Sequence, residues 1–254
     1  MDGSNEATRE YLGLARAAEE QSRAATVPTE IPVIDADSDV VFMQRFADLG
    51  RPVLIELPVP EHPWTLERFV AERGEQPVVV RKGEDYDAMK LAQTRAHTYL
   101  DPSRSTSFYA ARNPLPPQID QQTPRPPYLR ARQHPQLMHL WIGREGTGTR
   151  LHRDLLDNFV HVLDGTKHVQ LVAPHHADVL DIWQVEPALQ SSRVDLDALE
   201  PDARAELGVQ AVRVRPHQML FIPCGWFHQV RNETATLAIT CFLAGFPAWF
   251  RPPR

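Results

Sequence analysis

Cysteine, lysine and long apolar runs are all scarce in this chain of 254 residues. The two cysteines, Cys224 and Cys241, are too few for a disulfide framework, so we expect two free thiols in a reducing compartment. No apolar run reaches the roughly 18 residues that span a bilayer, and residues 1–20 carry acidic side chains instead of the apolar core of a secretory signal. The sequence therefore predicts a cytoplasmic protein with no membrane association.

Basic residues are also fewer than acidic ones. The chain has 27 lysines and arginines against 33 aspartates and glutamates, a formal net charge of −6. Proteins that bind a phosphate backbone usually have the opposite balance, so nucleic acid is not expected as a partner. Only three basic residues are lysines, at positions 82, 90 and 167, so a lysine in an apolar setting would be informative.

Proline is abundant, with 23 residues, and it favours turns and short strands over long helices. Helical spacing of apolar residues nevertheless predicts helices over residues 5–25, 40–49 and 64–72. Short apolar runs bounded by turn residues predict strands over residues 53–55, 78–80, 137–142, 158–163, 168–172, 212–214, 219–222, 227–230 and 236–243.

Many short strands of this kind are typical of an all-β sandwich or barrel. We expect residues 1–30 to form a helical extension and residues 31–254 to form one β-barrel domain. Residues 113–127, which include six prolines, are expected to form a long loop. Residues 177–208 are polar and are expected to form a partly helical insert.

The tripeptide His152-Arg153-Asp154 is a candidate for part of a metal site. On a strand, side chains two positions apart face the same way, which would place an imidazole beside a carboxylate. Ferrous iron in non-haem enzymes is held by two histidines and one carboxylate on one face. His228, in the segment Pro223-Cys224-Gly225-Trp226-Phe227-His228, could supply the third ligand from a later strand. The tripeptide alone is more often structural.

The nine remaining histidines lack such an acidic partner and are expected to be structural or exposed. They are residues 62, 97, 134, 139, 161, 168, 175, 176 and 217.

Lys167 follows a turn signal, Asp164-Gly165, between two apolar runs. A two-residue hairpin there would pair Val162 with Lys167 and Val160 with Val169, so that these side chains share one face. If that face points inward, an ammonium group is buried among valines and needs an anionic partner. No acid lies on that face of the two strands, so a bound carboxylate ligand would fit. The alternative, with the other face inward, leaves Lys167 in solvent.

Three motifs in this order resemble the JmjC branch of the cupin superfamily. They are Gly143–Asp154 with its H-x-D, Gly165-Thr166-Lys167, and Ile222-Pro223 followed by Trp226-Phe227-His228. The resemblance covers roughly residues 31 to 245. Within the family, the chain is similar to the small JmjC-only hydroxylases. It implies a mainly β fold, a double-stranded β-helix of the jelly-roll or cupin type, with N-terminal helices and a helical insert.

The resemblance also implies a ferrous iron and 2-oxoglutarate-dependent oxygenase that uses O₂. His152, Asp154 and His228 would be the iron ligands. Lys167 would take the distal carboxylate of 2-oxoglutarate, with Thr149 and Asn158 also in the cosubstrate site. Where several relatives have asparagine on the last core strand, this chain has Cys241, which would change the pocket. The dimerisation helices of some relatives are also expected to be missing after Trp249.

The most favoured reaction is hydroxylation of an unactivated C–H bond on a protein or peptide side chain. A small molecule or natural-product intermediate stays open as the substrate, and demethylation is less favoured because no chromatin-reader or zinc module is present. Two other classes stay open: a metal-binding cupin without oxygen chemistry, and a catalytically silent JmjC interaction module. Succinate release from 2-oxoglutarate would separate the oxygenase from both, and the sequence leaves monomer and dimer open.

Overall fold

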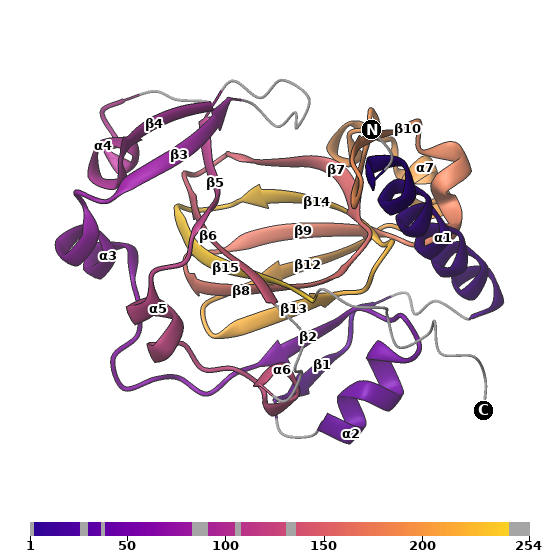
Figure 1. The fold of residues 1–254 in the computed structure, drawn as a ribbon, viewed down its shortest axis with the longest axis horizontal. Helices are drawn as coiled ribbons and strands as arrows, with labels where there is room; N and C mark the ends of the chain where they lie inside the picture. The colour runs from indigo at the N-terminus through magenta and orange to yellow at the C-terminus, as the bar shows by residue number, and fades with distance from the viewer. Residues whose placement is uncertain are drawn as a thin grey trace.

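The computed structural model describes residues 3–25, 30–36, 39–82, 91–104, 108–130 and 136–243. Two β-sheets face each other, with the helices at the periphery (Figure 1). His134 and the segment around Trp249, for which expectations were stated above, lie outside the described residues.

The larger sheet has nine strands and the smaller has six. In spatial order the larger contains β1 (Val33–Asp35), β2 (Val53–Glu56), β13 (Gln218–Ile222), β8 (Asp157–Asp164), β15 (Thr236–Leu243), β6 (Gln136–Gly143), β5 (Phe108–Pro114), β3 (Pro77–Lys82) and β4 (Leu91–Arg95). The smaller contains β10 (Ile182–Glu186), β11 (Leu189–Ser192), β7 (Gly148–Asp154), β14 (Phe227–Asn232), β9 (Lys167–Val172) and β12 (Gln210–Val214). The predicted double-stranded β-helix is confirmed, because the chain passes back and forth between the two sheets.

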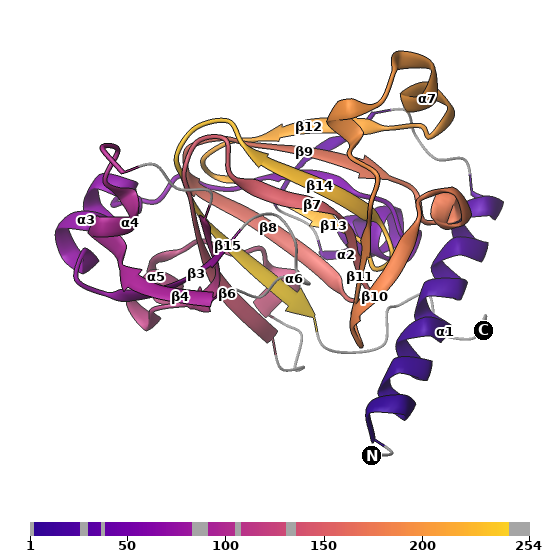
Figure 2. The same cartoon turned by 90° about the horizontal axis from the view of Figure 1, so that it is seen from above.

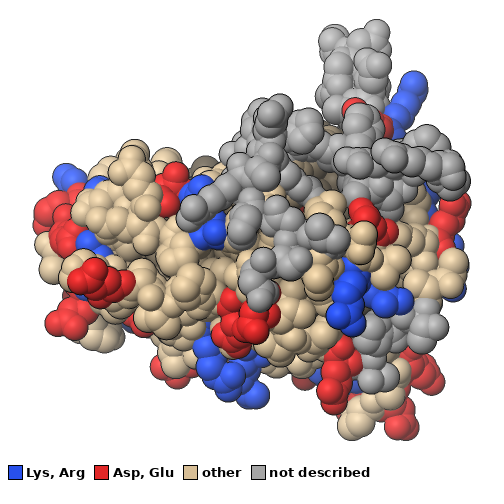
Figure 3. Space-filling model, turned by 90° about the horizontal axis from the view of Figure 1, so that it is seen from below, with Lys and Arg blue, Asp and Glu red and all other residues tan. Residues whose placement is uncertain are grey.

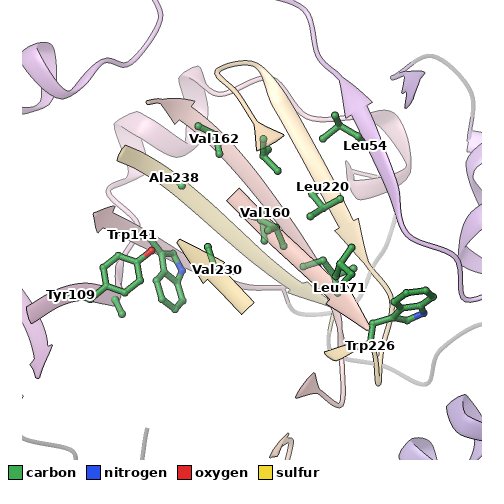
Figure 4. Packing of buried hydrophobic residues seen from close by; sticks show 14 of the residues in the cluster. Leu54, Tyr109, Trp141, Val160, Val162, Leu171, Leu220, Trp226, Val230 and Ala238 are labelled. Carbon is green, nitrogen blue, oxygen red and sulfur yellow. The ribbon is translucent and has the colours of Figure 1, made fainter. Parts of the chain in front are cut away.

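The main core lies between the sheets. Val160 and Val162 of β8 pack in one cluster with Val169 and Leu171 of β9, although the two strands belong to different sheets. Leu220 of β13 joins them, and Figure 4 shows Val160, Val162, Leu171 and Leu220 among the packed strands. A packed wall of this kind holds the strand ends rigidly, which is what a precise site requires.

Helices cover the ends and outer surfaces of the sheets (Figure 2). They are α1 (Gly3–Ala24), α2 (Asp39–Phe42) with the π-helical turn η1 (Met43–Ala47), α3 (Leu66–Arg73), α4 (Ala96–Leu100), α5 (Pro117–Gln122), α6 (Pro127–Arg130), the 3₁₀ turns η2 (Pro174–Val179) and η3 (Leu196–Ala198), and α7 (Pro201–Glu206). Within the described residues, no helix combines the length and the apolar character needed to cross a bilayer. On the face in Figure 3, acidic and basic side chains lie in small interspersed groups.

The predicted helices and strands are found with small shifts at their ends, but the long loop predicted over residues 113–127 is wrong. Residues 113–127 include α5, which begins at Pro117, a position where the missing N–H of proline costs no hydrogen bond. The insert at 177–208 contains α7 as expected, and also the hairpin β10–β11. That hairpin extends the smaller sheet by pairing β11 with β7.

The predicted hairpin at Asp164-Gly165 is also wrong. β8 pairs with β13 and β15, whereas β9 pairs with β12 and β14. The turn is a corner between the two sheets, and Gly165 takes a φ of +77° there. A Cβ atom on Gly165 would lie 2.0 Å from the Ala235 carbonyl oxygen, so the corner requires glycine. The inward direction of Lys167 was nevertheless right, because the inner faces of both sheets enclose the same core.

Candidate metal centre

Two paired strands bring three possible metal ligands together. In the antiparallel pair β7–β14, His152 lies directly opposite His228, and Asp154 is two residues further along β7. The imidazole ring centroids are 4.1 Å apart, and His228 Nε2 lies 3.6 Å from Asp154 Oδ2. Ligand atoms of all three residues lie within 4.8 Å of one another. The pairing of β7 with β14 therefore brings together two histidines that are 76 positions apart in the sequence.

Backbone carbonyls orient both imidazoles. Nδ1 of His152 is 2.8 Å from the Arg150 carbonyl oxygen, and Nδ1 of His228 is 3.1 Å from the Trp226 carbonyl oxygen. Since a carbonyl only accepts, each Nδ1 carries the proton and donates it. The lone pair of each Nε2 is thus left for a metal, the arrangement typical of metal-binding histidines.

Burial controls the charge of the three side chains, which are at most 7% exposed. Burial, and then the nearby His228, holds the pKa of His152 well below its ordinary value, and burial also lowers the pKa of His228. Burial raises the pKa of Asp154, against the opposing effects of His228 and Arg112. Two neutral imidazoles and a buried carboxylate match the donors of a 2-His-1-carboxylate iron site, and a divalent cation would compensate the buried negative charge.

A bulge aligns Thr149 with these ligands. His228 pairs with His152 and Val230 pairs with Thr149, so three residues of β7 span two of β14. The extra residue lets Thr149 and His152, three positions apart, both face the same cavity. Thr149 Oγ1 is buried, and within the described part of the chain it has no hydrogen-bond partner. Such a hydroxyl is available to a bound ligand.

Lys167 lies in the same cavity, which encloses about 460 Å³ of space, part of it open to solvent. Its side chain is 2% exposed, and Nζ donates to Tyr109 Oη at 2.8 Å and to Asn232 Oδ1 at 2.6 Å. Both partners are neutral groups. Burial therefore lowers the pKa of Lys167 to about 7. The anionic partner predicted for this lysine is not supplied by these two contacts, and a ligand carboxylate in the cavity would provide it.

Asn158 also faces the cavity and contacts a metal-ligand candidate. Its Nδ2 lies 3.4 Å from Asp154 Oδ2, a long contact that would help to orient the carboxylate. Its buried Oδ1 has no hydrogen-bond partner among the described residues.

Cys241 does not line the cavity, contrary to the expectation that it would change the pocket. It packs with Phe159 in a cluster on the opposite face of β15, while Ala238, Thr240 and Phe242 face the cavity. The pocket residue on this strand is Thr240, whose Oγ1 accepts a hydrogen bond from Trp141 Nε1 at 2.8 Å. Both cysteines are buried and free, as predicted.

Sequence reasoning missed Tyr109, Arg112, Asn232 and Thr240. Asn232 could have been found, because it is four positions after His228 on the same strand and period-two alternation places both on one face. Nothing in the sequence distinguishes Tyr109 and Arg112, which reach the cavity from β5 at the far side of β6.

Comparison with known proteins agrees with this geometry. The model of the cupin-like domain family matches residues 65–252. The chain belongs to the cupin-like JmjC family.

Relatives of this cupin-like domain share modest identity with it. Jumonji C domain-containing protein 5 of Drosophila melanogaster is 23% identical over 236 residues, which cover 83% of this chain and 59% of the relative. The bifunctional peptidase and (3S)-lysyl hydroxylase JMJD7 of Homo sapiens is 27% identical over 128 residues, covering 41% and 40%. Lysine-specific demethylase JMJ30 of Arabidopsis thaliana is 32% identical over 109 residues, covering 41% and 25%. The cupin-like chain thus spans about three-fifths or less of these relatives' lengths.

Proposed function

We propose that the protein is a ferrous iron and 2-oxoglutarate-dependent oxygenase that hydroxylates an unactivated C–H bond on a protein or peptide side chain. The observation that carries this proposal is the convergence of His152, Asp154 and His228 beside a buried Lys167 in one cavity. The JmjC family uses ferrous iron and 2-oxoglutarate, which supports the cofactor assignment.

Nε2 of His152, Nε2 of His228 and the carboxylate of Asp154 would hold the iron and leave three coordination positions open. Ferrous iron held there would supply the oxidising chemistry for the C–H bond, with O₂ and 2-oxoglutarate as cosubstrates and succinate and CO₂ as the products of 2-oxoglutarate. The protein holds the donors in place through the Arg150 and Trp226 carbonyls, and apolar side chains such as Trp141 and Val160 form part of the cavity wall.

Lys167, Tyr109 and Thr149 would bind the distal carboxylate of 2-oxoglutarate. Nζ of Lys167 and the phenol of Tyr109 are already 2.8 Å apart. The hydroxyl of Thr149, which has no hydrogen-bond partner among the described residues, would be a third donor in the same cavity. Asn158 would keep the Asp154 carboxylate in its binding orientation.

The choice of a protein side chain as substrate rests on the names of relatives, which include a lysyl hydroxylase and lysine-specific demethylases. We also infer that the protein works in the cytoplasm, because both of its cysteines are free and buried.

Succinate release tests the proposal. Purified protein with ferrous iron, ascorbate and 2-oxoglutarate is screened against peptide and metabolite pools, and succinate and product mass are measured. We expect iron-dependent succinate release that a productive pool stimulates. Lys167→Ala should weaken the binding free energy of 2-oxoglutarate by about 2–3 kcal/mol, because a charge-assisted hydrogen bond to its carboxylate is lost. Succinate release that does not depend on added iron would count against the assignment. So would a Lys167→Ala variant whose activity depends on 2-oxoglutarate concentration as in the wild type.

A further inference from the structure

Asn232 lies behind Lys167, away from the space that a ligand would occupy. The two residues are directly opposite each other in the antiparallel pair β9–β14, and Asn232 is 1% exposed. Its Oδ1 accepts a hydrogen bond from Nζ of Lys167 at 2.6 Å. Lys167 lines the cavity, whereas Asn232 is not one of the described residues in the cavity wall. Asn232 therefore acts on a ligand in the cavity through the lysine.

Hydrogen bonds fix which end of the Asn232 carboxamide faces the lysine. Thr147 Oγ1 donates its proton to the Arg144 carbonyl oxygen at 2.7 Å, so it can only accept a hydrogen bond from Asn232. Nδ2 of Asn232 is the donor to this oxygen, at 3.0 Å. Oδ1, at the other end of the carboxamide, is thereby directed at Lys167, and it also accepts from the Thr236 hydroxyl at 2.9 Å. The acceptor cannot turn away from Lys167 without breaking these contacts.

The backbone leaves space for this carboxamide. A Cβ atom on Gly143 would collide with Nδ2 of Asn232 and lie 2.6 Å from Oγ1 of Thr236, so the close approach requires glycine. The Asn232 N–H donates to the Thr147 carbonyl at 2.8 Å, and the Asn232 carbonyl accepts from the Gly146 N–H at 2.8 Å. Backbone and side-chain contacts together hold Asn232 in one position.

Fixed contacts leave one N–H of the Lys167 ammonium group for a ligand. An ammonium group has three N–H donors, and Nζ directs one to Asn232 and one to Tyr109 Oη, at 2.8 Å. The flexible four-carbon stem of a lysine loses conformational entropy when a ligand immobilises it. A lysine that is already held loses less, so a contact that fixes Nζ in advance strengthens the binding of a carboxylate.

We propose that Asn232 is a positioning residue for the cosubstrate: through a neutral acceptor it fixes Nζ of Lys167 so that the remaining N–H meets the distal carboxylate of 2-oxoglutarate. The inference rests on the proposed function. An aspartate at this position would make the same contact, but its negative charge would compete with the cosubstrate carboxylate for the ammonium group.

The titration of Lys167 reports on this contact. Burial lowers the pKa of Lys167 to about 7. Its paired neighbours, Val214 on β12 and Asn232 on β14, do not titrate. Tyr109 on β5 is the titratable group that contacts Nζ. Within the described part of the chain, the other titratable residues of the cavity wall are Arg112, His152, Asp154 and His228.

The test follows Lys167 directly, because the chain has only three lysines. The full chain is labelled with lysine that carries ¹³C at Cε, and the lysine signals are titrated with pH by NMR. Lys167→Arg identifies the Lys167 signal by its loss. In the Mn²⁺-loaded protein, the Kd of 2-oxoglutarate is measured below pH 7 by isothermal titration. The variants are Asn232→Asp and Asn232→Leu, and the control is Thr236→Val, which removes the other hydrogen bond to Oδ1.

We expect Asn232→Asp to raise the Lys167 titration midpoint by about two pH units, because a nearby opposite charge favours the ammonium form. Asn232→Leu should lower the midpoint by about one unit, because the charged form loses a hydrogen bond. Both variants should raise the Kd of 2-oxoglutarate about tenfold, since the first pairs the ammonium group internally and the second leaves it unheld. Thr236→Val should leave the midpoint and the Kd close to their wild-type values.

Shifts of the midpoint in opposite directions, with the same loss of affinity, would not arise from loosened packing alone. The proposal is wrong if Asn232→Asp leaves the Kd of 2-oxoglutarate unchanged. It is also wrong if Thr236→Val weakens binding as much as Asn232→Leu, because any disturbance of these side chains would then have the same effect. If Asn232→Leu does not fold, the result for Asn232→Asp decides.

Failure of this inference and failure of the proposed function give different results. A wild-type protein that does not bind 2-oxoglutarate refutes the proposed function, and the role of Asn232 in cosubstrate binding with it. Normal binding by the wild type, together with an unchanged Lys167 midpoint in Asn232→Asp, refutes the positioning role alone.

Discussion

The chemistry of the site depends on how single residues are held. His152 and His228 each donate Nδ1–H to a backbone carbonyl, so their Nε2 atoms are available without any rearrangement. Burial keeps both rings neutral, since it lowers both pKa values. A metal ion therefore does not have to displace protons from the histidines near neutral pH.

Removing one metal-binding side chain should weaken metal binding more than it lowers the stability of the fold. His152→Ala and Asp154→Ala are expected to abolish turnover and to weaken Mn²⁺ binding by at least about tenfold, measured by isothermal titration. His168→Ala, on a partly exposed histidine outside the cavity wall, is the control and should bind like the wild type. Full activity in either ligand variant would contradict the assignment.

Lys167 makes cosubstrate binding depend on pH. Burial lowers its pKa to about 7, so the protein without cosubstrate holds a charged lysine below pH 7 and a neutral one above. A dicarboxylate requires the charged form, and above pH 7 its binding must take up a proton. The Kd of 2-oxoglutarate should be flat below pH 7 and rise about tenfold per pH unit above it. Lys167→Arg, whose guanidinium stays protonated, should remove this rise; a slope that persists would assign it to another group.

At the residue scale, the sequence pointed to the ligand candidates and to Lys167 because each is marked by local pattern. Two-residue spacing on a strand placed His152 beside Asp154, and the valines around Lys167 indicated burial. Tyr109 could not be found, because its contact with Lys167 joins residues 58 positions apart in different sheets. Thr240 was missed in favour of Cys241, since a one-residue difference in register selects the opposite face.

At the scale of elements, a hairpin and a corner between sheets have the same sequence signature. Asp164-Gly165 separates two apolar runs in either case. Asp164 Oδ2 accepts a hydrogen bond from the Leu66 N–H at the start of α3, a distant contact that helps fix the corner. β10 and β11 were missed because they are short, partly polar strands whose pairing with β7 is non-local.

Helix α1 supports the centre from outside. Leu14 and Ala15 pack on Leu155 and Cys224, and a Cβ atom at Gly225 would lie 2.8 Å from the Cβ of Ala18. α1 therefore rests on the turn that leads to His228.

Glu19 of α1 also pairs with Arg153, which lies between two ligand candidates on β7, at 2.9 Å. Arg153 is 2% exposed and stacks on Phe227, so the carboxylate of Glu19 compensates a buried positive charge. Glu19→Ala should lower the free energy of unfolding by about 2 kcal/mol, measured by urea denaturation. Glu20→Ala, on an exposed neighbour in the same helix, is the control. Equal stability of the two variants would show that the pair contributes nothing.

At the scale of the whole molecule, the site exists because two sheets close over one cavity. The smaller sheet supplies the three ligand candidates and Lys167, while the larger supplies Tyr109, Arg112 and Asn158. Packing of the valines and leucines between the sheets sets these distances, so core and site form together. The barrel class was predictable from strand patterning, whereas the order of strands in each sheet was not, because it depends on pairings far apart in the chain.

The most direct test is an anaerobic titration of the Fe²⁺-loaded protein with 2-oxoglutarate, followed by visible absorption. Chelation of iron by a 2-oxo acid produces a metal-to-ligand charge-transfer band. We predict that the band appears and saturates at one 2-oxoglutarate per protein, is absent in His152→Ala, and requires more cosubstrate in Lys167→Ala. A wild-type protein that binds iron but develops no band at saturating 2-oxoglutarate would contradict the account.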